Sequence, residues 1–207
     1  MKLCSLVDAL LCRGDRRNSG ANDAVCSLGN IQGFAPKRVG DDCFVSVSDR
    51  LVKLAVFYHR EAARCVRGRA YLAACVMQGA ALEASLQAMC FLYSEPVKKT
   101  SVFQKKKFRR KRNKALEFKY YELINIADEL SWFPPKRITW GKRTTLAGFA
   151  HELRKLRNYV HPGVWVPERP DTMRFTKKVY GVAYEIFDVA NSWLLHLVME
   201  SLRKSLK

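Results

Sequence analysis

The chain has little negative charge. Its 207 residues include 19 Asp and Glu against 37 Lys and Arg, which gives a formal net charge of +18 at pH 7. A balance this uneven attracts polyanions, mainly because binding releases their counterions. We therefore expect RNA or another nucleic acid as the leading partner, with an acidic membrane surface as the alternative.

Patterns that bind metals and nucleotides are also missing. None of the seven cysteines forms a C-x-x-C pair, and no two of the four histidines have the short spacing of a helix-borne metal site, so we predict no metal. The glycines form no phosphate-cradling loop, and we expect no cofactor. The odd cysteine count indicates reduced thiols and a cytoplasmic location. Asp8 interrupts the apolar start, which disfavours a signal peptide.

No sustained alternation of polar and apolar residues marks a sheet, apart from a weak β-like stretch at Cys43–Val47. Helical periodicity dominates instead. We predict an all-α fold: an antiparallel bundle of four to five helices over residues 46–207, preceded by an irregular N-terminal arm over residues 1–45. The arm contains one short predicted helix, Leu3–Cys12.

The first two helices of the bundle have recognisable ends. Ser48 is the predicted N-cap of the first, and Gly68 breaks or bends it. The second, Ala70–Tyr93, is long enough to cross a bilayer, but it is mostly alanine with interspersed polar residues. Its composition favours a central helix that is buried on nearly all sides, and no transmembrane segment.

The remaining helices are delimited by prolines and caps. The third covers about residues 115–132 and is stopped by Pro134 and Pro135, and the fourth is capped by Thr144 or Thr145. The last helix is capped by Asp171 and runs into the C-terminal tail. Leu116 and Trp193 are among the apolar residues that the spacing predicts to face inward.

Glu83 is the single carboxylate or basic group in the second helix. Burying it without a partner would cost several kcal/mol or keep it protonated, so the fold should supply a cation or strong donors. Arg154 and Arg157 are the natural candidates. The alternative places Glu83 at the rim of the bundle, where it meets water.

A dense block of positive charge lies between Lys98 and Lys119, and repulsion among its charges predicts an exposed loop leading into a helix. Phe103 and Phe108 interleave with the charges and are candidates to stack on bases or insert into lipid. A solvated connector and a nuclear-import signal are the alternatives. The candidate RNA-binding residues are Lys105, Lys106, Lys107, Arg109, Arg110, Lys111 and Arg112.

The segment Leu153–Pro162 carries the candidate catalytic residues. At about 100° per residue, Arg154 and Arg157 lie within roughly 20° and 40° of His161 around a helix axis. An imidazole moves protons near neutral pH, and guanidinium groups bind phosphate oxygens, so the combination suits chemistry on a phosphodiester. The alternative is a pair of solvent-facing arginines and a histidine that caps the helix end.

These stretches together resemble the HEPN superfamily of small helical bundles. The likeness rests on Ala80–Glu83, on Leu123–Trp132 and on the signature Leu153–Pro162, and it extends over about residues 48–207. Active members carry an arginine and a histidine with four to six residues between them. Six residues separate Arg154 from His161, whereas three separate Arg157 from His161. Which of the two arginines binds the phosphate is therefore left open.

The resemblance implies metal-independent endoribonuclease activity of the toxin or defence type, which leaves a 2′,3′-cyclic phosphate. It implies that His161 transfers the proton and that Arg154 and Arg157 stabilise the negative charge on the phosphoryl oxygens. It also implies that Asn158 orients the phosphate or the imidazole, and that Glu83 holds an arginine in place without contacting the substrate. It also implies a homodimer and an antitoxin or other protein partner. The alternative function is a non-catalytic basic bundle that binds nucleic acid or a protein.

Overall fold

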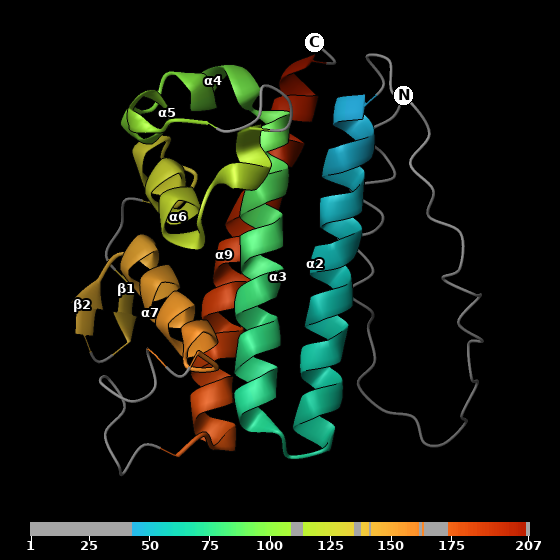
Figure 1. Ribbon diagram of the computed structural model, residues 1–207, viewed down its shortest axis with the longest axis vertical. Helices are drawn as coiled ribbons and strands as arrows, with labels where there is room; N and C mark the ends of the chain where they lie inside the picture. The colour runs from blue at the N-terminus through green and yellow to red at the C-terminus, as the bar shows by residue number, and fades with distance from the viewer. Residues whose placement is uncertain are drawn as a thin grey trace.

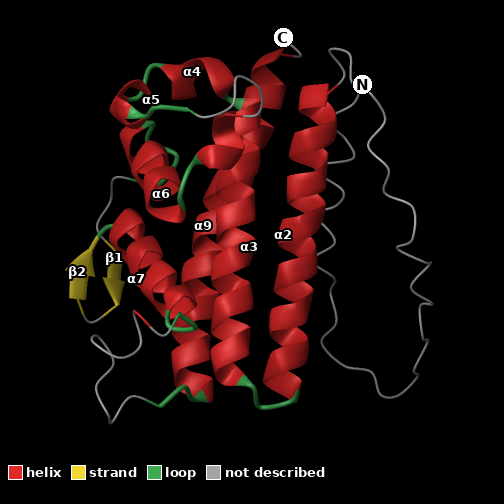
Figure 2. Cartoon of the chain, in the orientation of Figure 1, coloured by secondary structure: helices red, strands yellow, loops and turns green. Residues whose placement is uncertain are grey.

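The computed structural model describes residues 43–108, 114–134, 138–140, 142–161, 163 and 174–205 (Figure 1). Within these residues the fold is mostly helical (Figure 2), which confirms the all-α class. The predicted helix Leu3–Cys12, most of the predicted arm and the Asp171 cap lie outside the described residues. The elements are α2 (Cys43–Arg67), α3 (Tyr71–Leu92), α4 (Ser94–Lys98), α5 (Ser101–Lys105), the 3-10 turn η1 (Lys114–Glu117), α6 (Tyr120–Glu129), β1 (Ile138–Trp140), β2 (Lys142–Thr144), α7 (Leu146–Asn158) and α9 (Lys177–Ser205).

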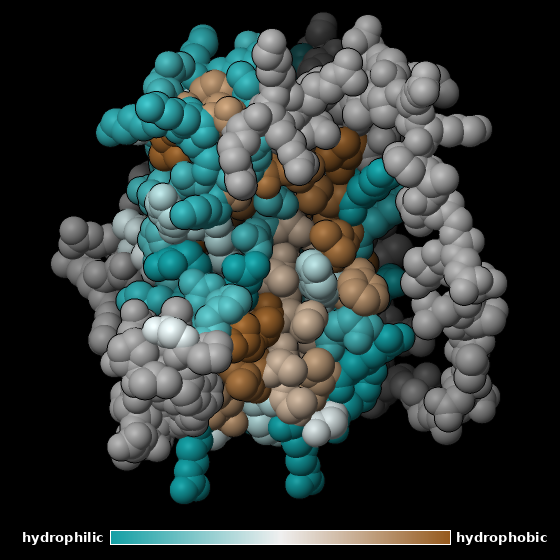
Figure 3. All heavy atoms as spheres, viewed as in Figure 1, coloured by the Kyte–Doolittle hydropathy of each residue, from teal (hydrophilic) through white to brown (hydrophobic). Residues whose placement is uncertain are grey.

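Helix α3 is the centre of the molecule. It packs against α2, α6, α7 and α9, and its apolar residues face all four neighbours because the helix carries almost no charge. By length and composition α3 could also cross a membrane, but 67% of its most apolar 18-residue stretch is buried inside the fold. Figure 3 shows its remaining surface as an apolar band between hydrophilic regions. The predicted central position of this helix is therefore confirmed.

The directions of the helices differ from the predicted antiparallel arrangement. Helix α2 does run antiparallel to α3, and His59 of α2 contacts Gln78 of α3. Helix α9 instead runs parallel to α3: Ser85 lies beside Asn191, and Tyr93 donates a hydrogen bond to the carbonyl of Leu197. The segment from α4 to α7 makes this possible, because it carries the chain back along the bundle before α9 begins (Figure 1).

Several predicted helix starts are corrected or confirmed. Cys43–Val47 is helical rather than β-like, Ser48 is buried inside α2 rather than at its N-cap, and the predicted boundary after residue 45 falls within this helix. The Thr145 prediction is correct, since its hydroxyl accepts a hydrogen bond from the Gly148 N–H at 3.2 Å.

The stretch between α5 and α7 is more irregular than predicted. Helix α6 spans Tyr120–Glu129 and is preceded by a separate 3-10 turn, in which Leu116 is 44% exposed rather than inward-facing. Trp193 of α9 is also exposed, at 40%. The predicted loop around residue 140 holds an antiparallel hairpin, β1–β2, in which Ile138 pairs with Thr144.

Candidate functional site

The C-terminal end of α7 carries the candidate catalytic residues, but they do not share one helical stripe. The helix ends at Asn158, and a turn over the next two residues follows. His161 therefore lies beyond the helix, where its backbone N–H donates to the Asn158 carbonyl at 2.9 Å. The angular prediction for His161 was wrong because it extended an ideal helix up to Pro162. The side chain of His161 is exposed to solvent.

Arg157 forms the predicted contact with Glu83. Its Nη2 lies 2.7 Å from Oε2 of Glu83, and the two side chains are 31% and 18% exposed. The guanidinium also lies over the ring of Tyr120 from α6, 5.9 Å from the ring centroid. Three helices thus hold this guanidinium, which still keeps some exposure to solvent. The expectation that an arginine of the signature pairs with Glu83 is confirmed.

A glycine of α3 allows this approach. A Cβ atom added at Gly79 would lie 2.7 Å from the Cβ and 3.1 Å from the Cγ of Arg157. Real Cβ atoms essentially never make contacts that short. Gly79 is one turn before Glu83, so the same face of α3 supplies both the space for Arg157 and its anionic partner. The role of Gly79 was not predicted from the sequence, although a lone glycine inside an apolar helix is a signal of close packing.

Burial dominates the electrostatics around this pair. Burial raises the pKa of Glu83 above its usual value, and the Arg157 charge opposes that rise. Burial and the nearby Glu83 also raise the pKa of Tyr120 well above its usual range. Tyr120 Oη and Arg154 Nε are buried and make no hydrogen bond within the described part of the chain. The packed interface between α3, α6 and α7 therefore holds polar groups that are only partly matched.

Arg154 takes a different position from Arg157. It lies half-buried on α7 and contributes to lowering the pKa of His151, for which burial is the larger cause. His151 itself contacts Asn125 of α6 at 3.3 Å. Asn158 is half-buried at the last position of the helix. Both arginines of the signature thus belong to the packed side of α7, while His161 faces solvent.

The predicted RNA-binding block is only partly available to a ligand. Lys106 is 15% exposed and lies 2.5 Å from Glu122, which also accepts a hydrogen bond from the Lys119 N–H at 2.6 Å. Lys106 therefore belongs to a structural ion pair, and its assignment to RNA binding stays a prediction. Lys105 and Lys107 are exposed. The other members of the block, Arg109, Arg110, Lys111 and Arg112, lie outside the described residues.

The aromatic residues of this block also have a structural role. Phe103 and Phe108 pack on each other with their ring centroids 4.8 Å apart, and both contact Phe118. Lys114 lies over the rings of Phe103 and Phe108. The two half-buried rings therefore fill a small aromatic cluster, and their stacking on bases or insertion into lipid stays a prediction.

The described lysines of the basic block and His161 lie towards opposite ends of the bundle. Helices α4 and α5 follow the C-terminal end of α3, whereas Val160 lies beside Ala73 near its N-terminal end (Figure 1). Helix α3 has 22 residues, so at about 1.5 Å per residue it is about 33 Å long. The structure therefore does not bring Lys105 and Lys107 close to the residues of the signature.

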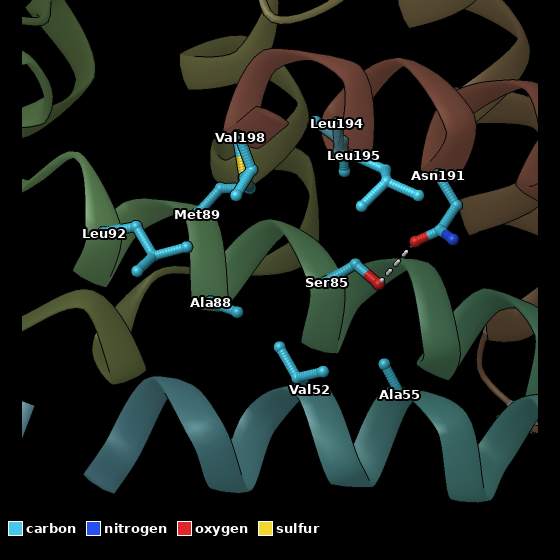
Figure 4. A pocket seen from close by; sticks show the side chains of 10 residues that line it. All are labelled: Val52, Ala55, Ser85, Ala88, Met89, Leu92, Asn191, Leu194, Leu195 and Val198. Atoms are coloured by element: carbon cyan, nitrogen blue, oxygen red, sulfur yellow. Dashed lines mark hydrogen bonds between the residues drawn. The ribbon is translucent and has the colours of Figure 1, made fainter. Parts of the chain in front are cut away.

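Other parts of the described structure offer little chemistry. A pocket between α2, α3 and α9 is lined almost entirely by apolar side chains, and its polar contact joins Ser85 and Asn191 at 3.3 Å (Figure 4). Its volume of about 20 Å³ suits one water molecule. Among the described residues, no three His, Cys, Asp or Glu side chains gather as metal ligands would.

The chain was compared with protein-family models, with curated proteins and with solved structures, and none of the three comparisons gave a match.

Proposed function

We propose that this chain is a metal-independent endoribonuclease of the toxin or defence type, built on a HEPN-like bundle of four to five helices. One observation carries the proposal: Glu83 and Tyr120 hold Arg157 in the last turn of α7, and an exposed histidine, His161, follows directly. A guanidinium that is held in place and an exposed imidazole four positions later in the chain are the two kinds of group that phosphodiester cleavage needs.

In the proposed reaction, the His161 imidazole removes the proton from a ribose 2′-hydroxyl. The 2′-oxygen then attacks the adjacent phosphorus, and the bond to the 5′-oxygen breaks as that oxygen takes up a proton. The products are a 2′,3′-cyclic phosphate and a 5′-hydroxyl. The added negative charge on the phosphoryl oxygens is stabilised by a guanidinium of the signature, Arg154 or Arg157, while Asn158 orients the phosphate or the imidazole.

Glu83 has a positioning role in this proposal. Its carboxylate fixes Nη2 of Arg157, so the guanidinium keeps its orientation at no further entropic cost when substrate binds. The partly exposed side chain of Arg157 leaves room for a phosphate contact. A cytoplasmic location, a homodimer and an antitoxin or other protein partner belong to the same proposal. The location rests on the odd cysteine count, and the homodimer and the partner rest on the resemblance alone.

The alternative is a non-catalytic basic bundle that binds nucleic acid or a protein. One observation favours it: Arg157 already has an anionic partner and an aromatic neighbour, as a purely structural arginine would. The two functions differ in whether His161 is needed for anything besides folding.

The deciding experiment incubates the purified protein with labelled RNA in EDTA. We expect cleavage with cyclic-phosphate ends and a loss of about 10²- to 10⁴-fold in rate for His161→Ala. The matched control is His196→Ala, another exposed histidine, on α9. Both variants should keep the wild-type stability, since exposed substitutions usually change it by about 0.5 kcal/mol or less. If His161→Ala cleaves RNA as fast as the wild type, the proposed nuclease mechanism is refuted. If the wild type does not cleave RNA at all, the non-catalytic bundle is the function that remains.

A further inference from the structure

A second concentration of positive charge surrounds the end of the bundle near His161. Five exposed basic residues come from the end of α2, from the α2–α3 turn and from the start of α9: Arg67, Arg69, Arg174, Lys177 and Lys178. We call these residues the basic end. Figure 3 shows hydrophilic side chains extending from this lower part of the molecule.

Three described stretches that meet at this end of the bundle are free of carboxylates. The stretches 62–82, 153–163 and 174–184 contain no Asp or Glu. By contrast, the region around α5 includes carboxylates: Glu122 pairs with Lys106, and Glu129 accepts a hydrogen bond from the Ser101 N–H. A surface without carboxylates attracts phosphates more strongly than one of mixed charge.

A groove crosses the basic end beside His161. One wall is the α2–α3 turn and the first turn of α3, from Arg69 to Ala73, and the other wall is Val160 and Phe175. Phe175 meets Tyr159 edge to face, with the ring centroids 6.1 Å apart. Tyr71 and Phe175 both line the groove, and both are half-buried. Aromatic walls next to fixed positive charge are a recurring platform for single-stranded nucleic acid.

The backbone at Arg69 adds a further observation. Its φ is 57°, in the left-handed region that favours glycine, and the preceding residue is itself Gly68. A residue with a β-carbon adopts this left-handed conformation at a free-energy cost on the order of 1 kcal/mol relative to the right-handed one. The turn therefore carries a guanidinium at a position where glycine would fit with less strain. Such a cost is common where a side chain has a role in binding.

We infer that the basic end, rather than the block at 105–112, is the surface that binds single-stranded RNA. A base enters the groove between Tyr71 and Phe175, while Arg69, Lys177 and Lys178 contact backbone phosphates. The strand then passes Val160 and reaches His161 without crossing the length of α3. This inference rests on the proposed function for its choice of RNA as the ligand.

The test compares two double variants with the same change of charge. Lys177→Ala/Lys178→Ala alters the basic end, and Lys105→Ala/Lys107→Ala alters the exposed lysines at the far end. Each is titrated by fluorescence anisotropy with a 2′-O-methyl oligonucleotide, which binds but cannot form a cyclic phosphate. The slope of log K against the logarithm of salt concentration is negative. It should become shallower by about 0.7 for each phosphate that the variant no longer neutralises. We expect this change in the first variant alone.

Two single variants test the groove. Phe175→Ala should weaken binding by about five-fold to a hundredfold, the range for removing one base stack. Arg69→Gly should weaken binding while the melting temperature stays level or rises, because glycine suits the left-handed backbone. Since this variant keeps its fold, any weaker binding reports the missing guanidinium rather than unfolding.

The outcomes are distinguishable from those of the cleavage assay, because the modified oligonucleotide reports binding alone. Equal losses of affinity in both double variants, or a loss only in Lys105→Ala/Lys107→Ala, overturn the inference. It is also overturned if the wild type ignores the oligonucleotide and binds anionic phospholipid vesicles instead. If binding depends on the basic end but unmodified RNA is never cut, the inference stands and the nuclease proposal fails.

Discussion

Replacing Gly79 by alanine tests whether the close approach of α3 and α7 holds Arg157 in place. The new Cβ would lie 2.7 Å from the Cβ of Arg157, whereas ordinary contacts are 3.4–4 Å. That atom of Arg157 is fixed to the α7 backbone, so no change of rotamer relieves the contact. The helices must separate by about 1 Å, and overpacking of this kind typically costs about 1–3 kcal/mol.

Helix propensity acts in the opposite direction. Alanine is favoured over glycine inside a helix by about 0.8–1.0 kcal/mol, so the net change for Gly79→Ala should be a destabilisation of up to about 2 kcal/mol. The matched control is Gly181→Ala in α9, where the added atom meets nothing within 4 Å. It receives the same propensity gain without the contact and should be stabilised by about 1 kcal/mol or less.

The assay is urea unfolding followed by far-ultraviolet circular dichroism at constant pH and salt. The difference between the two variants, rather than either value alone, measures the steric term, because propensity cancels. We also expect Gly79→Ala to slow RNA cleavage, since it displaces Arg157 from Glu83. If Gly79→Ala is as stabilising as Gly181→Ala, then α3 and α7 are not closely packed at this point and the account of Arg157 fails.

Two further predictions follow from burial. Because the pKa of Glu83 is raised, the folded state binds the Glu83 proton more tightly than the unfolded state does. The contribution of Glu83 to the free energy of unfolding therefore falls as the pH rises from the usual pKa of 4.5 through the pKa of the folded state. Glu83→Gln should therefore gain stability relative to the wild type between pH 4 and pH 7 in urea titrations, and a constant difference would contradict the shift. Burial also raises the pKa of Cys75 to about 12 and that of Cys90 still higher, so iodoacetamide at pH 8 should label half-buried Cys65 first. Peptide mass spectrometry measures this order, and equal labelling of all three in the folded protein would refute it.

The sequence predicted best where one residue type decides the outcome locally. A helix with a single charged residue can be stable in water only if neighbours cover it, which is why the central position of α3 was predictable. The Thr145 cap follows in the same way from a hydroxyl placed before an apolar helical run. The pairing of Glu83 with an arginine was predictable from the cost of burying a charge, even though two arginines were equally acceptable.

Features that depend on distant segments were missed. The parallel direction of α9 depends on the path of the whole intervening chain, which no local pattern contains. Lys106 belongs to an ion pair with Glu122, sixteen positions away, so a run of lysines did not reveal that one of them is committed. The helical stripe through His161 failed because α7 ends at Asn158, and the energetic difference between one more turn and a stop is small.

The parallel course of α3 and α9 has a consequence for synthesis. Ala81, Leu82 and Leu86 are completely buried in the finished fold, and α9 supplies part of that cover. All of residues 93–176 must leave the ribosome before α9 begins, which at about 5–20 residues per second takes several seconds. During that interval α3 is packed against α2, but the side of α3 that α9 later covers is exposed to solvent. Nascent chains should therefore depend on chaperones that shield such surfaces.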